Sequence, residues 1–189
     1  MDTPTVMGMT GYIEVAGLRT WHQVSGEGEP LVLLHGGFVG ASSFFAQVPA
    51  LVEAGYRVHV PERRGQAHTP DVEGPVSYSV MAYDPVSPDG PGHFPVVHAK
   101  MMRMFATEPE IALDTLAGVT APTLVLQGDR DEVTVEHSLA VVAALPEARL
   151  AVLPGTHTLP LEHPELVNPL IVSFLRDTNP APDWDAFTG

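Results

Sequence analysis

The residues with the clearest chemical use follow a short apolar run in the first quarter of the chain. Leu31-Val32-Leu33-Leu34 is continuously apolar and stops at His35-Gly36-Gly37-Phe38. An apolar run that ends at two glycines is typical of a buried parallel strand that leads into a tight loop. The backbone N–H groups of such a loop can hold the negative charge that develops on a substrate oxygen. We interpret residues 35–38 as an oxyanion or substrate-binding loop; the alternative is a glycine turn that only lets the next helix pack closely.

The segments that must position this loop alternate between strand-like and helix-like patterns. Residues 56–60 form a second apolar run, and the segment before it carries apolar side chains at helical spacing and ends at Gly55. A strand, a helix and a strand within so few residues indicate a βαβ unit and a parallel sheet. We expect a hairpin of two strands at 12–15 and 18–24, followed by strands at 31–35, 56–60, 122–127 and 149–153. We expect helices at 42–54 and 95–106, and a third helix that Thr134 caps and that ends before Pro146. The last helix should have Asn168 as its N-cap and Pro169 as its first residue.

Composition restricts the chemistry and the partners. The 189 residues are 44% apolar, which suits one domain with a full core, and the net charge of −14 would repel nucleic acids and anionic membranes. The chain has no cysteine, and its nine histidines show no metal-binding spacing, so we expect no metal and no other cofactor. No signal-peptide pattern and no apolar run of about 18 residues occurs, which predicts a cytoplasmic protein.

Four loops, taken together and in order, resemble those of the α/β-hydrolases. The loop at 35–38 resembles their oxyanion-hole loop, and Pro61-Glu62-Arg63-Arg64-Gly65-Gln66 resembles the loop after their fourth strand. Gly128-Asp129-Arg130-Asp131 resembles the turn that bears the acid of the catalytic triad. Pro154-Gly155-Thr156-His157 resembles the loop that bears the triad histidine. The resemblance extends from about residue 12 to residue 175.

This resemblance implies an architecture and two catalytic side chains. The fold would be α/β, a mostly parallel sheet of about six strands flanked by helices, in a reduced α/β-hydrolase domain. That single domain would span residues 1–177 with a short cap remnant near 85–118, and residues 178–189 would form a flexible tail. The triad acid carries over to Asp131 and the triad histidine to His157, where the carboxylate would orient the imidazole. The alternative is that both are ordinary loop residues.

The family's nucleophile motif is absent from this sequence. Gly-x-Ser-x-Gly, which presents a serine hydroxyl on a strained turn between a strand and a helix, does not occur. Ser77, Ser79 and Ser87 lie where the motif would be expected, but no such turn surrounds them. We therefore expect a reaction without a covalent serine intermediate.

Three functions are compatible with this pattern. The first is hydrolysis of small ester, lactone or related carbonyl compounds by a His157/Asp131 general-base dyad with a partial oxyanion hole. The second is a catalytically silent binding or partner protein, or a truncated remnant, which the absent motif favours. The third is a non-hydrolytic acid/base enzyme, such as a lyase or cyclase, on the same fold.

The absent segment also predicts a rearranged sheet. Without it, the strand at residues 31–35 would have an unpaired edge, and each buried unpaired N–H or C=O group costs about 1–3 kcal/mol. We expect the strand at 122–127 to pair directly with 31–35. The alternative is a homodimer in which a second copy of the chain supplies the missing neighbours.

Overall fold

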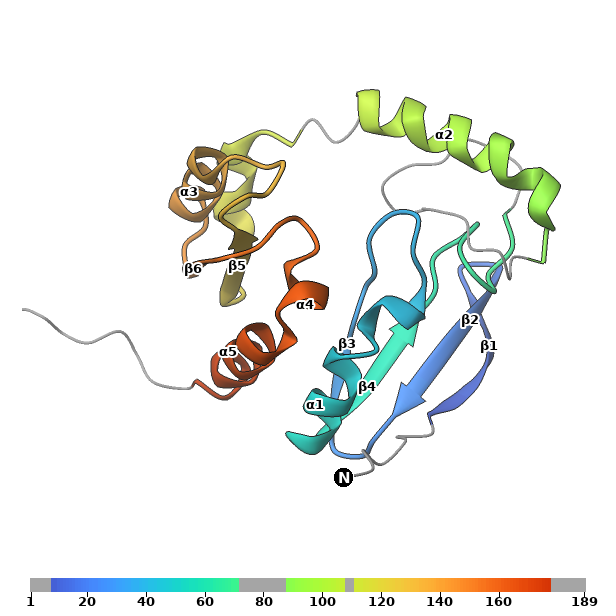
Figure 1. Ribbon diagram of the computed structural model, residues 1–189, viewed down its shortest axis with the longest axis horizontal. Helices are drawn as coiled ribbons and strands as arrows, with labels where there is room; N and C mark the ends of the chain where they lie inside the picture. Colours follow the sequence, from blue (N-terminus) through green and yellow to red (C-terminus); the bar gives the residue numbers. More distant parts are fainter. Residues whose placement is uncertain (1–7, 72–87, 108–110, 178–189) are drawn as a thin grey trace, which may run out of the picture.

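The computed structural model describes residues 8–71, 88–107 and 111–177. The expected tail at 178–189 and the three serines considered as nucleophiles lie outside these ranges. The described strands and helices form two groups, one built on β1 to β4 and one on β5 and β6 (Figure 1).

The first group begins with the expected hairpin. Strand β1 (Met9–Val15) pairs antiparallel with β2 (Leu18–Ser25) in the register Val15↔Leu18. The two turn residues, Ala16 and Gly17, have φ angles of 50° and 79°. Two successive positive φ angles are the geometry of a type I′ turn, whose twist matches that of the flanking strands.

The hairpin continues into a four-stranded sheet of order β1-β2-β4-β3. Strand β4 (Tyr56–Pro61) pairs antiparallel with β2, and β3 (Glu29–Val32) pairs parallel with β4. The connection from β3 to β4 contains the short 3-10 helix η1 (Ala41–Phe44) and helix α1 (Gln47–Glu53). The single helix expected over 42–54 is thus divided in two, while Gly55 ends it with a φ of +94° as expected.

The core of this group lies on one face of the sheet. Val58 and Val60 of β4 are fully buried against Leu51 of α1. The apolar run at 31–34 was expected to lie in a buried strand, and this was wrong: β3 ends at Val32, which is 56% exposed, and Leu34 beyond it is 59% exposed. Strand β3 is the edge of the sheet, so its side chains that point away from α1 stay at the surface.

The second group is a parallel βαβ unit. Strands β5 (Thr123–Gly128) and β6 (Ala148–Leu153) pair along their whole length, and helix α3 (Val135–Ala144) connects them. Thr134 caps α3 as predicted, because its side chain accepts the backbone N–H of His137. The short helix η3 (Leu113–Gly118) precedes β5.

The expectation of one continuous, mostly parallel sheet was wrong. The described residues contain six strands, but they form a mixed sheet of four and a separate parallel pair, and β3 is not a neighbour of β5. Helices join the two groups instead. Ile171, Val172 and Leu175 of helix α5 (Pro164–Arg176) pack against the core beneath α1. Their burial supplies the contact that was expected from strand pairing.

Helix α5 also begins earlier than predicted. It starts at Pro164, directly after the short helix α4 (Leu159–Glu162), and Pro169 lies inside it. Asn168 is therefore not an N-cap. Its amide donates to the backbone carbonyl of Ala46 at 2.9 Å. Pro169 leaves only the carbonyl of Glu165 without its helical donor, and Glu165 is in the exposed first turn, where water can bind that carbonyl.

Helix α2 (Phe94–Thr107) is preceded by the short 3-10 helix η2 (Pro91–His93) and buries Val97, Met101 and Met104. Ion pairs fasten it to the loop after β4. The carboxylate of Asp71, only 5% exposed, contacts Arg64 Nε at 3.1 Å, His93 Nε2 at 3.1 Å and Lys100 Nζ at 2.6 Å. Within the described ranges, no helix has the length and apolarity needed to cross a membrane.

Candidate active site

Asp131 and His157, the two side chains predicted to act together, are in contact. His157 Nδ1 lies 3.0 Å from Asp131 Oδ1. Because a carboxylate only accepts hydrogen bonds, Nδ1 carries the proton that is shared with Asp131, and Nε2 is left as the basic nitrogen. The side chain of His157 is 66% exposed, whereas that of Asp131 is 10% exposed. The pair thus has the geometry of a general base and the acid that orients it.

The pairing of β5 with β6 brings these two residues together. Gly128 ends β5 directly opposite Leu153, the last residue of β6, so the loops that follow leave the sheet side by side. Asp129 then ties the loops to each other. Its N–H donates to the carbonyl of Leu153 at 2.8 Å, and its Oδ1 accepts the N–H of Gly155 at 2.9 Å.

The environment of Asp131 favours its ionised form. Burial alone would raise the pKa of Asp131, but the N–H of Val133 and the imidazole of His157 both bond to Oδ1 and outweigh it. The pKa of Asp131 therefore lies below its usual value. The side-chain amide of the buried Gln127 holds the same loop by donating to the carbonyl of Val133.

Two further residues fix the backbone around His157. A Cβ at Gly128 would lie 2.4 Å from the carbonyl oxygen of Gly155 and 2.5 Å from that of Thr156, so glycine permits this close approach. The carboxylate of Glu162 accepts the N–H of Thr156 at 2.8 Å and the hydroxyl groups of Thr156 and Thr158. These bonds, those from Thr156 above all, lower the pKa of Glu162.

His35, predicted to belong to an oxyanion or substrate-binding loop, is a buried structural residue. It is 1% exposed, and its two nitrogens bond to the backbone: Nε2 accepts the N–H of Arg63 at 3.2 Å, and Nδ1 lies 3.0 Å from the carbonyl of Gly36. Burial lowers the pKa of His35, which keeps the imidazole neutral. Its role is to join the loop after β3 to the loop after β4.

Phe38 is the member of this loop that faces α2. Its ring lies 6.0 Å from that of His98 and 6.1 Å from that of Phe105, measured between centroids. Phe38 has a φ of +60°, which turns the backbone sharply after Gly36 and Gly37. Its N–H donates to no other described residue.

The two halves of the predicted site are linked through helices. Among the described residues, no hydrogen bond or ring contact joins residues 35–38 to Asp131 or His157. Gln47, at the start of α1, instead donates to the carbonyl of Pro160 in α4 at 2.7 Å. Helix α1 follows the 35–38 loop and α4 follows the His157 loop, so this bond fixes one loop relative to the other.

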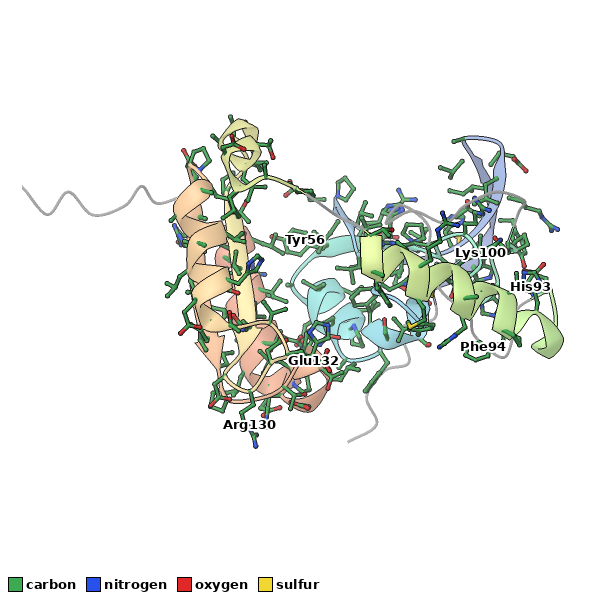
Figure 2. The ribbon with its side chains drawn as sticks, turned by 90° about the horizontal axis from the view of Figure 1, so that it is seen from above. Tyr56, His93, Phe94, Lys100, Arg130 and Glu132 are labelled. Atoms are coloured by element: carbon green, nitrogen blue, oxygen red, sulfur yellow. The ribbon has the colours of Figure 1, made fainter. Side chains whose placement is uncertain are left out.

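The ionic cluster around Asp71 is separate from this site. Figure 2 shows Phe94 and Lys100 of α2, with His93 directly before this helix, on the opposite side of the molecule from Arg130 and Glu132, which flank Asp131 in the sequence. In residues 8–71, 88–107 and 111–177, no three His, Asp or Glu side chains are grouped in a way that would hold a metal ion.

Sequence reasoning missed the residues that position the dyad. Gln127, Asp129 and Glu162 act through hydrogen bonds to loop backbone, and Gln47 acts through a contact between helices. Gln127 alone carried a signal in the sequence, because a polar residue at the end of an apolar strand indicates a role at the loop that follows. The partners of the other three depend on how the loops fold.

No protein-family model and no curated protein sequence matches the chain. Several solved structures do resemble it. The enol-lactonase from Burkholderia xenovorans LB400 has a TM-score of 0.69 and 16% identity, over 88% of this chain and 100% of that one. A serine hydrolase involved in carbazole degradation has a TM-score of 0.72 and 18% identity, over 89% and 99% of the two chains. The bromoperoxidase from Bacillus anthracis has a TM-score of 0.64 and 20% identity, over 90% and 100%. With the order of its loops and helices, these likenesses show that the chain has the α/β-hydrolase fold.

Proposed function

We propose that this protein hydrolyses small esters or lactones with His157 as general base and without a covalent serine intermediate. The observation that carries the proposal is the 3.0 Å contact between His157 Nδ1 and Asp131 Oδ1, which leaves Nε2 exposed and basic. The lactonase among the similar structures supports a cyclic or acyclic ester as substrate class.

The reaction needs only water and the dyad. A water molecule attacks the carbonyl carbon of the ester while His157 Nε2 takes one of its protons. The carbonyl π electrons move to oxygen, and Asp131 stabilises the imidazolium that forms. The tetrahedral intermediate then collapses, the C–O bond to the alcohol breaks, and the imidazolium returns the proton to the departing oxygen.

The N–H of Phe38 supports the charge on the intermediate oxygen in this proposal. In serine hydrolases a second N–H follows the nucleophile, and the sequence holds no Gly-x-Ser-x-Gly to provide it. Loss of one such donor costs about 2.7–4 kcal/mol of transition-state stabilisation. General-base catalysis alone contributes about 10²–10⁴-fold. We therefore expect slow turnover, fastest with activated esters and strained lactones.

The test is the hydrolysis of p-nitrophenyl acetate and of dihydrocoumarin by the purified protein. His157→Gln should reduce the rate to that of buffer, and Asp131→Asn should reduce it strongly. His163→Gln is the matched control, because His163 also pairs with a carboxylate, that of Glu165 at 3.1 Å, outside the dyad. Equal losses in His157→Gln and His163→Gln would refute a specific site.

A fluorophosphonate probe tests the second half of the proposal. The probe labels only activated serines, and we expect no labelling of the wild-type chain. A labelled serine would show that the reaction proceeds through an acyl-enzyme. A protein without turnover of either substrate would instead favour the binding role that the absent motif suggests.

A further inference from the structure

Helix α2 is held to the rest of the protein along neighbouring stripes of its surface. The middle stripe is apolar and consists of Val97, Met101 and Met104, which are 2%, 0% and 1% exposed. Because an α-helix has about 3.6 residues per turn, the positions on either side of this stripe form two flanks that face different parts of the molecule. Figure 2 shows one residue of each flank, Lys100 and Phe94, on opposite sides of the helix.

The first flank, which we call the aromatic flank, consists of Phe94, His98 and Phe105. The ring centroid of His98 lies 6.0 Å from that of Phe38 and 5.6 Å from that of Phe94. Phe105 follows about two turns after His98, and its ring centroid lies 6.1 Å from that of Phe38. Phe38 is therefore packed against one line of α2 residues, and a helix turned about its own axis would present others.

The second flank carries Lys100, the only lysine of the chain, which is bonded to a buried carboxylate. Lys100 Nζ lies 2.6 Å from Asp71 Oδ2, and the side chain of Asp71 is 5% exposed. The same carboxylate contacts Arg64 and His93. The N–H of Asp71 donates to Asp89 Oδ2 at 2.7 Å. These contacts fix Asp71 in place, so it gives Lys100 a stationary partner.

The apolar stripe and the ion pair restrain different motions of the helix. Burial of the apolar stripe holds α2 against the body of the protein, but apolar contact is non-directional and permits a small rotation of the helix about its axis. A charge-assisted hydrogen bond is short and depends on the angle between its partners. The bond between Lys100 and Asp71 can therefore fix the rotation that the apolar stripe leaves free.

We propose that the Lys100–Asp71 pair sets the rotation of α2 and so holds the aromatic flank against Phe38. Both members of the pair are then positioning residues for the loop at 35–38. Phe38 has a φ of +60°, a conformation that a bulky residue keeps only where its surroundings impose it. The effect on activity rests on the hydrolysis proposed above, whereas the effect on the ring contacts does not.

A general stabilising role for positive charge on α2 is the competing explanation. Arg103 provides the comparison, because it is a second cation on the same helix and is exposed to solvent. Removal of either charge changes the net charge of α2 by the same amount. The proposal assigns a positioning role to the charge of Lys100 and none to that of Arg103.

The first test is the proton NMR resonance of His98 Cε1–H at about pH 8.5, where histidines are neutral. The rings of Phe38 and Phe94 shift this resonance, and His98→Gln identifies it by its loss. We expect Lys100→Gln to move it towards the value of an exposed histidine, whereas Lys100→Arg should keep most of the shift and Arg103→Gln all of it. An unchanged resonance in Lys100→Gln would overturn the proposal, as would an equal change in Arg103→Gln.

Asp71→Asn removes the other partner of the bond and should move the His98 resonance in the same direction. The double variant Lys100→Gln/Asp71→Asn should move it no further than Asp71→Asn alone, because both changes remove one interaction. Additive shifts would contradict the assigned pair. Asp71→Asn also deprives Arg64 and His93 of a partner, so circular dichroism checks its fold; if that variant unfolds, Lys100→Gln decides.

The second test is the hydrolysis of p-nitrophenyl acetate. Lys100→Gln should lower kcat about tenfold and change KM less than about twofold, because a misplaced loop affects the transition state more than substrate binding. Lys100→Arg should restore most of kcat, and Arg103→Gln should leave it unchanged. A moved His98 resonance with an unchanged kcat in Lys100→Gln would overturn the positioning role. Absence of hydrolysis by the wild type would refute the proposed function, and the His98 resonance would still decide whether the pair orients the helix.

Discussion

The buried side chain of Gln47 donates a 2.7 Å hydrogen bond to the backbone carbonyl of Pro160, across 113 positions of sequence. The same nitrogen lies 3.2 Å from Asn168 Oδ1, whose own amide donates to the carbonyl of Ala46. These bonds join the start of α1 to α4 and α5, so they fix the loop at residues 35–38 relative to the His157 loop.

Replacement of Gln47 should therefore weaken the junction between the two groups of strands. Gln47→Ala removes the hydrogen-bond donor of the Pro160 carbonyl and of Asn168 Oδ1. The loss should lower the free energy of unfolding by about 1–3 kcal/mol. Urea titration measures this cost. Gln47→Ala combined with Asn168→Ala should cost less than the sum of the single changes, because they share partners. Gln23→Ala, which removes only a bond to the nearby Ser25, should cost much less.

Glu162 should be required for an ordered His157 loop. Glu162→Ala removes the acceptor of the Thr156 N–H and of two hydroxyl groups. We expect severalfold faster hydrogen exchange at the Thr156 amide and a matching loss of His157-dependent hydrolysis. Glu162→Gln keeps one acceptor oxygen, so its exchange rate at the Thr156 amide and its hydrolysis rate should lie between those of the wild type and of Glu162→Ala. Glu165→Ala is the control, since the Glu165 carboxylate bonds to His163 and to its own backbone N–H and does not bond Thr156; the same exchange change there would rule out the assigned role.

Gly128 should tolerate no side chain. In Gly128→Ala the new Cβ would meet the carbonyl oxygens of Gly155 and Thr156 at 2.4 and 2.5 Å, and backbone atoms cannot rotate away. Overpacking of this kind costs about 1–3 kcal/mol of stability and should separate His157 from Asp131. Thermal unfolding and the rate of ester hydrolysis measure the two effects. Gly118→Ala has no atom within 4 Å of the new Cβ and should leave both unchanged.

His35 should make the stability of the protein depend on pH. Burial lowers its pKa in the folded state, while the unfolded chain titrates near pH 6.5. Below about pH 6.5 the unfolded chain binds a proton that the folded chain does not, so the free energy of unfolding falls as the pH falls. Its contribution is complete above that pH and is lost as the pH approaches the lowered folded value.

The measurement is urea unfolding at several pH values between about 7.5 and about 5, a range that brackets the pKa of a histidine in the unfolded chain. His35→Gln should be less stable at neutral pH, because the bonds to Arg63 and Gly36 are altered, and should show a shallower pH dependence than the wild type. Identical slopes for the wild type and His35→Gln would mean that another group controls this window.

The sequence by itself determined the local elements and the two residues of the dyad. The hairpin turn at Ala16 and Gly17, the cap at Thr134 and the end of α1 at Gly55 depend on backbone preferences of one or two residues. Asp131 and His157 were identified because their two loops resemble the α/β-hydrolase loops that bear the triad acid and histidine, and these loops follow paired parallel strands whose carboxyl ends lie together. Backbone preferences were sufficient for the local elements, and the resemblance of the loops was needed for the two site residues.

The tertiary structure alone decided which strands pair and what each polar side chain contacts. The apolar run at Leu31 to Leu34 predicts a strand, but not that it ends the sheet with Val32 exposed, because an edge strand and a central strand share one pattern. Asn168 is suited both to an N-cap and to the tertiary bond with Ala46 that it makes. The choice between two such uses depends on burial free energy shared among α1, α4 and α5, which no single stretch of sequence contains.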